Sequence, residues 1–319
     1  MPPSVVVPTD APRGECRAVV DVGTNSVKLL VARVLGSHIE PVLERSIQSR
    51  LGEGFFSSGE LKPEAIARTA DAVAGFREEA MRHQPARFRV IATAAAREAR
   101  NPDQLKDALR VAAGVEIEII SGHSEADLAF RGVCSTPGLE NRPLLVADVG
   151  GGSTELILGT PGHRCFGRSF PLGAVRLWDV MKPSDAPTPS DLQRCRAYLD
   201  SWLAENVLPE LRESLLAHSP AFVGVGGTAS VLACMVSGLE RFDRQRIEAT
   251  HMDVSTLTTL TSRVWSLPLS ERRCLLGLPP ERADIILTGS AIYESLLRAL
   301  GLPSMRPSTR GVRFAALLD

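Results

Sequence analysis

Apolar residues recur along this chain in short runs that end in glycine-rich turns. The run 144–149 is followed by a turn of three glycines, a serine and a threonine, after which apolar residues resume. Such a pattern predicts a buried strand, a tight turn and a second strand. The run 18–22 and the turn 23–26 have the same build, with Asp21 and Asp148 at equivalent places. Two copies of one turn, far apart in the chain, indicate a duplicated domain.

The rest of the pattern alternates strands with helices, which is typical of an α/β protein. Apolar residues at helical spacing predict a helix over 62–83, and a third glycine turn at 226–230 follows an apolar run and opens a helix. Further strands are predicted at 17–22, 27–34, 39–47, 87–92, 115–120 and 164–171. Further helices are predicted at 101–113, from 121, from about 172, at 190–218 with a break at Pro209, and at 252–267, 270–277 and 281–300, followed by a short last helix.

The residues of the central turn suggest a site for phosphate and a metal. Glycines lack Cβ, so their backbone N–H groups can crowd against an anion, and hydroxyls from Ser153 and Thr154 add donors. Asp148 and Glu155 would repel a phosphate unless a cation lay between them, which points to a hard divalent ion such as Mg²⁺. Two such turns on facing domains would form the walls of a cleft.

Several charged residues have both a functional and a structural interpretation. Arg97, in a junction of small residues, could bind a phosphate with its planar guanidinium, or it could be an exposed arginine paired with a neighbour such as Glu98. Glu125, in the first turn of a helix, could be a general base or only a capping residue. For Arg282 and Asp284 a structural ion pair is favoured over a ligand role.

Length and composition narrow the protein class. A chain of 319 residues favours about two domains, and a net charge of −1 gives no general attraction to nucleic acid or to an anionic membrane. Six scattered cysteines without a CxxC pair resemble neither a disulfide framework nor a zinc site. Residues 1–15 read as a disordered lead-in without the pattern of a secretory signal, and no apolar stretch approaches a membrane span. A soluble cytoplasmic protein is expected.

Six motifs together resemble a known family. They are Asp-Val-Gly-Thr-Asn-Ser (21–26), Ala-Thr-Ala-Ala-Ala-Arg-Glu-Ala-Arg-Asn (92–101), Ile-Ser-Gly-x-x-Glu-Ala (120–126), Asp-Val-Gly-Gly-Gly-Ser-Thr-Glu-Leu (148–156), Gly-Gly-Thr-Ala (226–229) and Arg-Ala-Asp-Ile-Ile (282–286). In this order they are similar to the exopolyphosphatase / guanosine pentaphosphate phosphohydrolase (Ppx/GppA) family, and they cover nearly the whole chain after residue 16.

The resemblance implies an α/β fold of two ribonuclease H-like domains of the actin, sugar kinase and Hsp70 type, flanking a central cleft. The expected domains are 16–135 and 136–319, and the last helix, at about 306–319, is a candidate to pack back on the first domain. The chain looks like the short two-domain form of the family, and relatives suggest a homodimer.

The resemblance also implies hydrolysis of a terminal phosphoanhydride bond with Mg²⁺ or another divalent cation. The substrate would be inorganic polyphosphate, with release of orthophosphate, or guanosine pentaphosphate (pppGpp). A phosphotransferase of the same superfamily and a non-hydrolytic polyphosphate or alarmone sensor remain alternatives. No nucleic-acid or membrane partner is expected.

Site residues follow from the matched motifs. Glu125 matches the catalytic glutamate that would orient or deprotonate the attacking water, and Glu155 the second essential carboxylate. Asp148, Asp21 and Glu155 are the expected metal ligands. The expected phosphate-binding residues are Gly23, Thr24, Asn25, Ser26, Arg97, Gly150, Gly151, Gly152, Ser153, Thr154, Gly227 and Thr228.

The chain departs from the family pattern at two places. Ser124 stands where the family usually has the first of two adjacent glutamates, a change that could alter metal binding or the pH optimum. Ser230 replaces a threonine at the end of the third glycine turn, which exchanges one hydroxyl for another.

Overall fold

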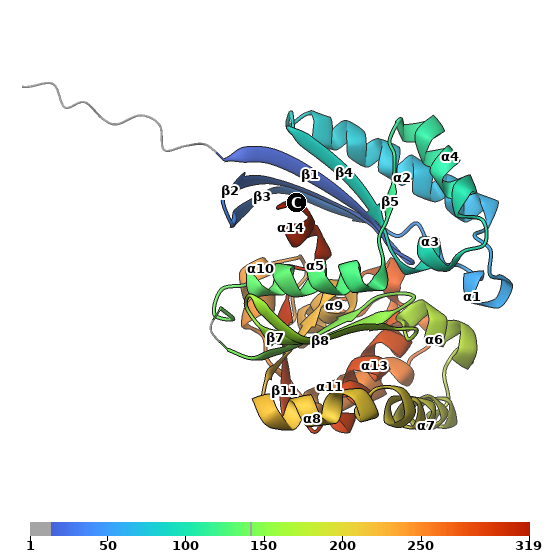
Figure 1. Ribbon diagram of the computed structural model, residues 1–319. Coiled ribbons are helices and arrows are strands. Elements are labelled where there is room, and N and C mark those ends of the chain that lie inside the picture. The colour runs from blue at the N-terminus through green and yellow to red at the C-terminus, as the bar shows by residue number, and fades with distance from the viewer. Residues whose placement is uncertain (1–13, 141) are drawn as a thin grey trace, which may run out of the picture.

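The computed structural model describes residues 14–140 and 142–319. They form two mixed β-sheets, one above the other in Figure 1, each covered by helices. Most of the predicted lead-in lies outside the described residues, and the first strand already begins at Glu15. No helix in the described ranges is long and apolar enough to cross a membrane.

The first sheet has the strand order β3-β2-β1-β4-β5. Strands β1 (Glu15–Val22), β2 (Val27–Leu35) and β3 (His38–Ile47) form an antiparallel meander, as predicted. Strands β4 (Arg87–Ala92) and β5 (Glu118–Ile119) then add in parallel on the other side of β1. The central strands are apolar at nearly every position because helices or other buried segments cover both of their faces.

The second sheet repeats the first. Its order is β10-β11-β9-β6-β7-β8, so that β8-β7-β6-β9-β11 corresponds to β3-β2-β1-β4-β5 with the same strand directions. This repetition confirms the predicted α/β fold of two ribonuclease H-like domains. The strands are β6 (Leu144–Val149), β7 (Thr154–Thr160), β8 (His163–Phe170), β9 (Ala221–Val225), β10 (Met252–Asp253) and β11 (Ser304–Ser308).

Each of the duplicated turns is closed by an equivalent backbone hydrogen bond. Gly23 donates its N–H to the carbonyl of Ser26 at 3.0 Å, and Gly150 donates its N–H to the carbonyl of Ser153 at 2.9 Å. A Cβ on Gly23 would lie 3.1 Å from the carbonyl oxygen of Ser26, and a Cβ on Gly150 would lie 3.2 Å from that of Ser153. The equivalence inferred from the sequence therefore extends to the backbone geometry.

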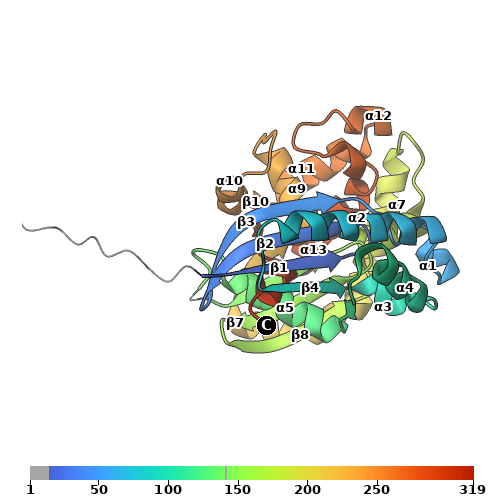
Figure 2. The same ribbon diagram turned by 90° about the horizontal axis from the view of Figure 1, so that it is seen from above.

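Helices cover the outer faces of both sheets. In the first domain, α2 (Pro63–Met81) lies across the sheet and packs against α4 (Pro102–Ala113), as Figure 2 shows. In the second, α7 (Pro189–Asn206), α11 (Val254–Trp265) and α13 (Ile286–Ala299) pack together over the outer face. Apart from two helices between the sheets, the others in the described residues are α1 (Phe55–Ser58), α3 (Ala94–Glu98), α6 (Ala174–Met181), α8 (Leu208–His218), α9 (Gly226–Val236), α10 (Arg244–Ala249) and α12 (Leu269–Arg272).

Two helices lie between the sheets. Helix α5 (Gly122–Cys134) packs on β7 and β8, although the predicted boundary at 135/136 assigns it to the first domain. Helix α14 (Val312–Ala316) contacts α5 together with β1 and β2. Both contribute to one apolar cluster that also includes residues of both sheets. The domain boundary itself stays a prediction.

Several elements differ from the predicted pattern. The long helix at 190–218 is interrupted at Val207, because Pro209 is accommodated in the first turn of α8. The predicted helix at 281–300 is a 3₁₀ turn (Pro280–Arg282) followed by α13. Residues 304–308, placed just before or inside the last helix by the sequence, form β11, and α14 is only five residues long. Helix α12 ends after four residues instead of reaching 277.

Candidate active site

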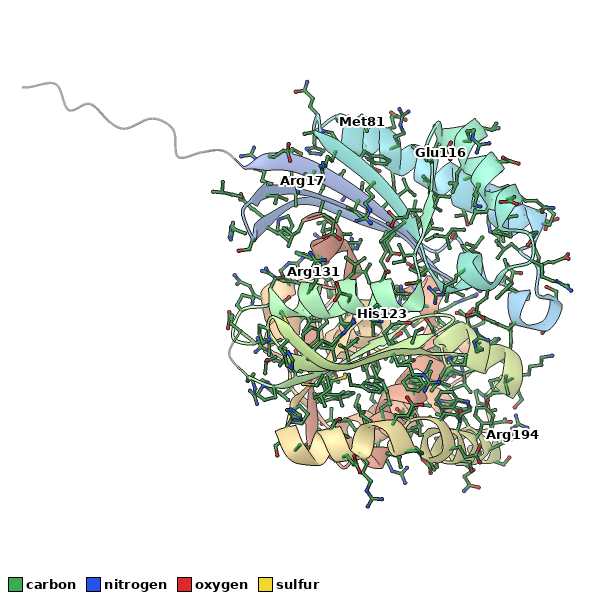
Figure 3. The ribbon with its side chains drawn as sticks, in the orientation of Figure 1. Arg17, Met81, Glu116, His123, Arg131 and Arg194 are labelled. Carbon is green, nitrogen blue, oxygen red and sulfur yellow. The ribbon has the colours of Figure 1, made fainter. Side chains whose placement is uncertain are left out.

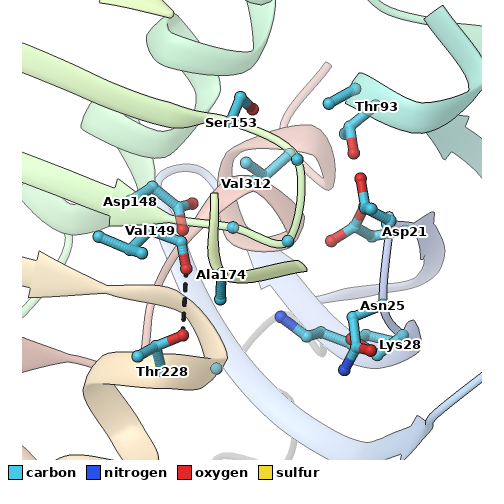
Figure 4. A pocket seen from close by; sticks show the side chains of 18 of the residues that line it. Asp21, Asn25, Lys28, Thr93, Asp148, Val149, Ser153, Ala174, Thr228 and Val312 are labelled. Carbon is cyan, nitrogen blue, oxygen red and sulfur yellow. Dashed lines mark hydrogen bonds between the residues drawn. The ribbon is translucent and has the colours of Figure 1, made fainter. Parts of the chain in front are cut away.

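A cavity of about 80 Å³ lies between the sheets, where the glycine turns face each other (Figure 4). All predicted site residues line this cavity except Arg97 and Thr154. The Thr154 hydroxyl instead donates to the carbonyl of Leu172. The lining residues that the sequence predicted are Asp21, Gly23, Thr24, Asn25, Ser26, Glu125, Asp148, Gly150, Gly151, Gly152, Ser153, Glu155, Gly227 and Thr228.

The second turn is held by the start of α6. Backbone N–H groups of Ala174 and Val175 donate to the carbonyls of Gly150 and Gly151 at 2.9 and 2.8 Å. The carbonyl of Gly152 accepts from Arg176 Nε at 2.7 Å. With these carbonyls turned toward α6, the N–H groups of Gly151 and Gly152 make no hydrogen bond within the described chain. Such a row of free amides is suited to an anion.

The first turn is held in the same way by the loop after β3. Arg50 N–H donates to the carbonyl of Asn25 at 2.9 Å, and Gly52 N–H donates to the carbonyl of Thr24 at 2.7 Å. The two turns also touch each other. A Cβ placed on Gly152 would lie 2.8 Å from Thr24 Oγ1 and 3.1 Å from the ring of Phe56. The cleft is therefore closed at this point, and it closes only because residue 152 has no side chain.

Four carboxylates line the cavity: Asp21 and Asp148, which are partly buried, and Glu125 and Glu155, which are buried. Burial raises the pKa of Asp148 to about 6. It raises the pKa of Glu155 to about 7, an effect that nearby Asp148 increases and the hydroxyl of Ser169, 2.6 Å from Glu155 Oε1, opposes. Burial also raises the pKa of Glu125 well above its ordinary value, with Glu155 adding to the shift. So many acids in one small space favour a bound cation.

The donor set fits a hard divalent ion. Asp21 and Asp148 reach the cavity from opposite sheets (Figure 4), and Asp21 Oδ1 is buried without a hydrogen-bond partner in the described chain. Within residues 14–140 and 142–319 no three His, Cys, Asp or Glu side chains are arranged to hold an ion by themselves. Mg²⁺ commonly takes one or two carboxylates and fills its shell with water and phosphate oxygens. The assignment of Asp21, Asp148 and Glu155 as ligands stays a prediction.

Two basic residues at the cavity were missed by the sequence analysis. Lys28 follows the first turn, and its pKa is lowered by burial against an opposing effect of Asp21. Its register offers a signal: Asp21 pairs with Lys28 across β1 and β2 as Asp148 pairs with Glu155 across β6 and β7. Lys28 is thus the first-domain equivalent of Glu155.

Arg282 is the second missed residue, and the ion pair expected between Arg282 and Asp284 is wrong. Asp284 accepts instead from Arg50 at 2.7 Å. The guanidinium of Arg282 lies over the third glycine turn, where a Cβ on Gly227 would approach it to 2.4 Å. Burial lowers the pKa of Arg282, whose guanidinium makes no hydrogen bond or ion pair to the described residues. The sequence pattern could not show that Arg282, at the end of the 3₁₀ turn, and Asp284, just after it, point in different directions.

Arg97 and Glu125 are partners rather than independent residues. Arg97 Nη1 donates to Glu125 Oε2 at 2.9 Å and to the carbonyl of Ile120 at 3.1 Å. Glu125 does not cap α5, because the Ser121 hydroxyl accepts the Ser124 N–H at 3.1 Å in that role. Ser124 itself is exposed, and its hydroxyl lies 2.9 Å from that of Ser121, so the departing residue does not line the cavity.

Comparison with known proteins assigns this chain to a family. The model of the Ppx/GppA phosphatase family matches residues 30–319. Exopolyphosphatase 2 of Mycobacterium tuberculosis is 33% identical over 293 residues, which are 89% of this chain and 90% of the relative. Exopolyphosphatase 1 of the same organism is 29% identical over 289 residues, and the match covers 90% of this chain and 83% of the relative.

Solved structures agree. The crystal structure of an exopolyphosphatase from Cytophaga hutchinsonii superposes with a TM-score of 0.85 at 25% identity, covering 95% of this chain and 96% of the other. The Ppx/GppA family member from Aquifex aeolicus gives a TM-score of 0.77 at 24% identity, with 95% and 96% covered, and thus shares the fold.

Proposed function

Since this chain belongs to the Ppx/GppA phosphatase family, we propose that it is an exopolyphosphatase that removes the terminal phosphoryl group of inorganic polyphosphate as orthophosphate. The proposal rests on one arrangement above all. Two anion-binding turns meet across the cleft, and a buried carboxylate, Glu125, lies beside them. The exopolyphosphatases among its relatives support the choice of polyphosphate.

The chain's own donors would hold the terminal phosphates. The free amides of Gly151 and Gly152 bind phosphate oxygens, and Lys28 and Arg282 neutralise their charge. A neighbouring cavity of about 250 Å³ shares Lys28 and Arg282 with the first and adds Arg313. The part of the substrate beyond the scissile bond would lie there.

Glu125 would act on the attacking water. Its Oε2 is held by Arg97, so the proton of the water passes to Oε1 as the water oxygen bonds to phosphorus and the bridging oxygen leaves with the shortened chain. The raised pKa makes Glu125 a stronger base than an exposed glutamate. A divalent ion held by Asp21 and Asp148 would supply charge neutralisation at the phosphate oxygens. Positioning and electrostatics account for most of the rate in such a reaction.

The test is release of orthophosphate from long-chain polyphosphate and from guanosine pentaphosphate, measured side by side with Mg²⁺. Glu125→Gln should lower the turnover of polyphosphate by about 10²- to 10⁴-fold. Glu116→Gln is the matched control, because Glu116 is exposed at the outer edge of the first domain (Figure 3) and should leave turnover unchanged.

The neighbouring cavity also supports the nucleotide as the alternative substrate. Its walls include Phe242, whose side chain is exposed, beside the phosphate-facing Lys28 and Arg282. If phosphate is released from guanosine pentaphosphate but not from polyphosphate, guanosine pentaphosphate becomes the proposed substrate. Binding of either compound without release would contradict hydrolysis and favour a sensor, and an ATP-dependent phosphorylated product would favour a phosphotransferase.

A further inference from the structure

Each phosphate turn is tied to the opposite domain through one arginine. In the second domain, Arg176 donates from Nε to the carbonyl of Gly152 at 2.7 Å and from Nη2 to Glu98 of the first domain at 2.6 Å. Its guanidinium also lies over the ring of Phe56, 4.1 Å from the centroid. The backbone N–H of Arg176 donates to the carbonyl of Gly151 as well. One residue therefore joins the turn to the facing domain.

The first domain has a counterpart. Arg50 donates its backbone N–H to the carbonyl of Asn25, in the first turn. Its side chain reaches the second domain, where Nη1 donates to Asp284 Oδ2 at 2.7 Å and Nη2 to the carbonyl of Glu281 at 3.2 Å. The two arginines thus form reciprocal contacts: each belongs to one domain, supports that domain's turn and bonds a carboxylate of the other.

The acceptors of these bonds sit next to charged residues of the site. Glu98 follows Arg97 in α3, and Arg97 holds Glu125. Asp284 is two residues after Arg282, which lines the cavity. Each contact between domains therefore also fixes the backbone that carries an arginine of the site, Arg97 through its bond to Glu125 and Arg282 at the cavity itself. Figure 1 shows α1, α3 and α6, which carry or flank the Arg176 contacts, gathered at one edge of the molecule.

We propose that Arg50 and Arg176 are positioning residues that hold the cleft closed and so place the two turns, Arg97 and Arg282 for turnover. We call the pairs Arg176–Glu98 and Arg50–Asp284 the interdomain bridges. Neither arginine lines the cavity, so both act through other groups. The proposal deepens the proposed function and rests on it where turnover is concerned. Closure of the cleft, in contrast, can be measured without any turnover of substrate.

The experiment compares Arg176→Gln, Arg50→Gln and the double variant with Arg45→Gln. Arg45 pairs with Glu79 at 3.0 Å inside the first domain, so it controls for loss of an arginine ion pair without a bridge. Each bridge variant should lower kcat/KM for polyphosphate about tenfold, mainly through KM, because substrate binding must then close the cleft. The double variant should lose less than the product of the two single losses, since both bridges stabilise one closed state.

Two further variants separate closure from support of the turn. Glu98→Gln weakens its bridge but leaves the bond from Arg176 Nε to the carbonyl of Gly152 in place. Asp284→Asn weakens the other bridge, in which Arg50 supports Asn25 through its backbone N–H, a bond that every variant keeps. Small-angle X-ray scattering, recorded with inorganic phosphate present, should give a larger radius of gyration for these variants and for the arginine variants than for Arg45→Gln. Arg176→Lys, which keeps the charge opposite Glu98, should recover part of the lost kcat/KM.

The proposal fails if the bridge variants keep the kcat/KM and the radius of gyration of Arg45→Gln. It also fails if their lost activity only parallels a lowered Tm while the KM is unchanged. Should the wild-type protein release no phosphate from either substrate, the proposed function is wrong, and the scattering comparison still decides whether the bridges close the cleft.

Discussion

Arg97 Nη1 and Glu125 Oε2 lie 2.9 Å apart and join α3 of the first domain to the helix that lies between the sheets. The group predicted to bind phosphate is thus the direct partner of the group predicted to accept the proton. Both roles depend on one bond, because Arg97 lowers the pKa of Glu125 against the effect of burial.

Removing that partner should shift the pH dependence of the reaction. In Arg97→Met the pKa of Glu125 rises further, so the ionised base forms only at higher pH. The acidic limb of the kcat/KM profile for polyphosphate should therefore move to higher pH, together with a fall in kcat/KM of about 10²-fold because Glu125 loses the partner that holds it in place. An acidic limb that stays in place or moves to lower pH would show that Arg97 does not set the ionisation of Glu125. Arg45→Gln provides the control.

The buried acids should make stability depend on pH. The folded-state pKa values of about 6 for Asp148 and about 7 for Glu155 exceed those of unfolded carboxyls, so the folded state binds more protons and stability falls as pH rises from about 4 to 7. Glu155→Gln should then stabilise the metal-free protein by about 1–3 kcal/mol at pH 8 and by much less at pH 5. Urea denaturation with a chelator measures this, with Glu116→Gln expected to show no such pH-dependent gain.

A methyl group on the second turn should disrupt the closed cleft. In Gly152→Ala the new Cβ would lie 2.8 Å from Thr24 Oγ1 and 3.0 Å from the Cβ of Ala94, so the side chain of Thr24 or the facing segments must move. Phosphate release should fall by about 10²-fold, a misplacement effect. Gly75→Ala is the control: it lies in α2 with no atom near the added Cβ, and should stabilise the protein by about 0.5–1 kcal/mol with normal activity. Normal activity in Gly152→Ala would contradict the closed geometry.

Restoring the family's first glutamate should change little. Ser124 is exposed and lies outside the cavity, so Ser124→Glu adds a carboxylate that water solvates. We expect kcat and the Mg²⁺ concentration for half-maximal rate to stay within about twofold of wild type, since surface charges act weakly at a distance. A large fall in the required Mg²⁺ would show that position 124 reaches the metal.

The sequence predicted those parts of the fold that depend on a local pattern of residues, such as the two glycine turns and the hairpins around them. The match between the turns at 21–26 and 148–153 predicted the duplication, and both hairpins form with equivalent registers. The prediction of contacts failed where it depended on the direction in which a side chain points. Arg282 and Asp284 are two residues apart in the chain, but one faces the cavity and the other the loop of Arg50.

Short elements were missed for a related reason. Strand β11 contains Pro307 and only five residues, so its identity depends on the neighbouring β9 rather than on its own pattern. Likewise, nothing in the sequence of Gly122–Cys134 indicates which sheet receives α5, because an apolar helix face fits either.

The pairing of Lys28 with Asp21 and of Glu155 with Asp148 gives the cleft a polarity. The two hairpins have equivalent registers, so with identical side chains they would form a site whose two sides are alike. A base at one of the equivalent positions and an acid at the other break that equivalence. Linear polyphosphate reads the same from either end, so it carries no direction of its own. Under the proposed function, the opposite charges of Lys28 and Glu155 would supply one, because they would distinguish the end of the cleft that admits the chain from the end that receives its terminal phosphate.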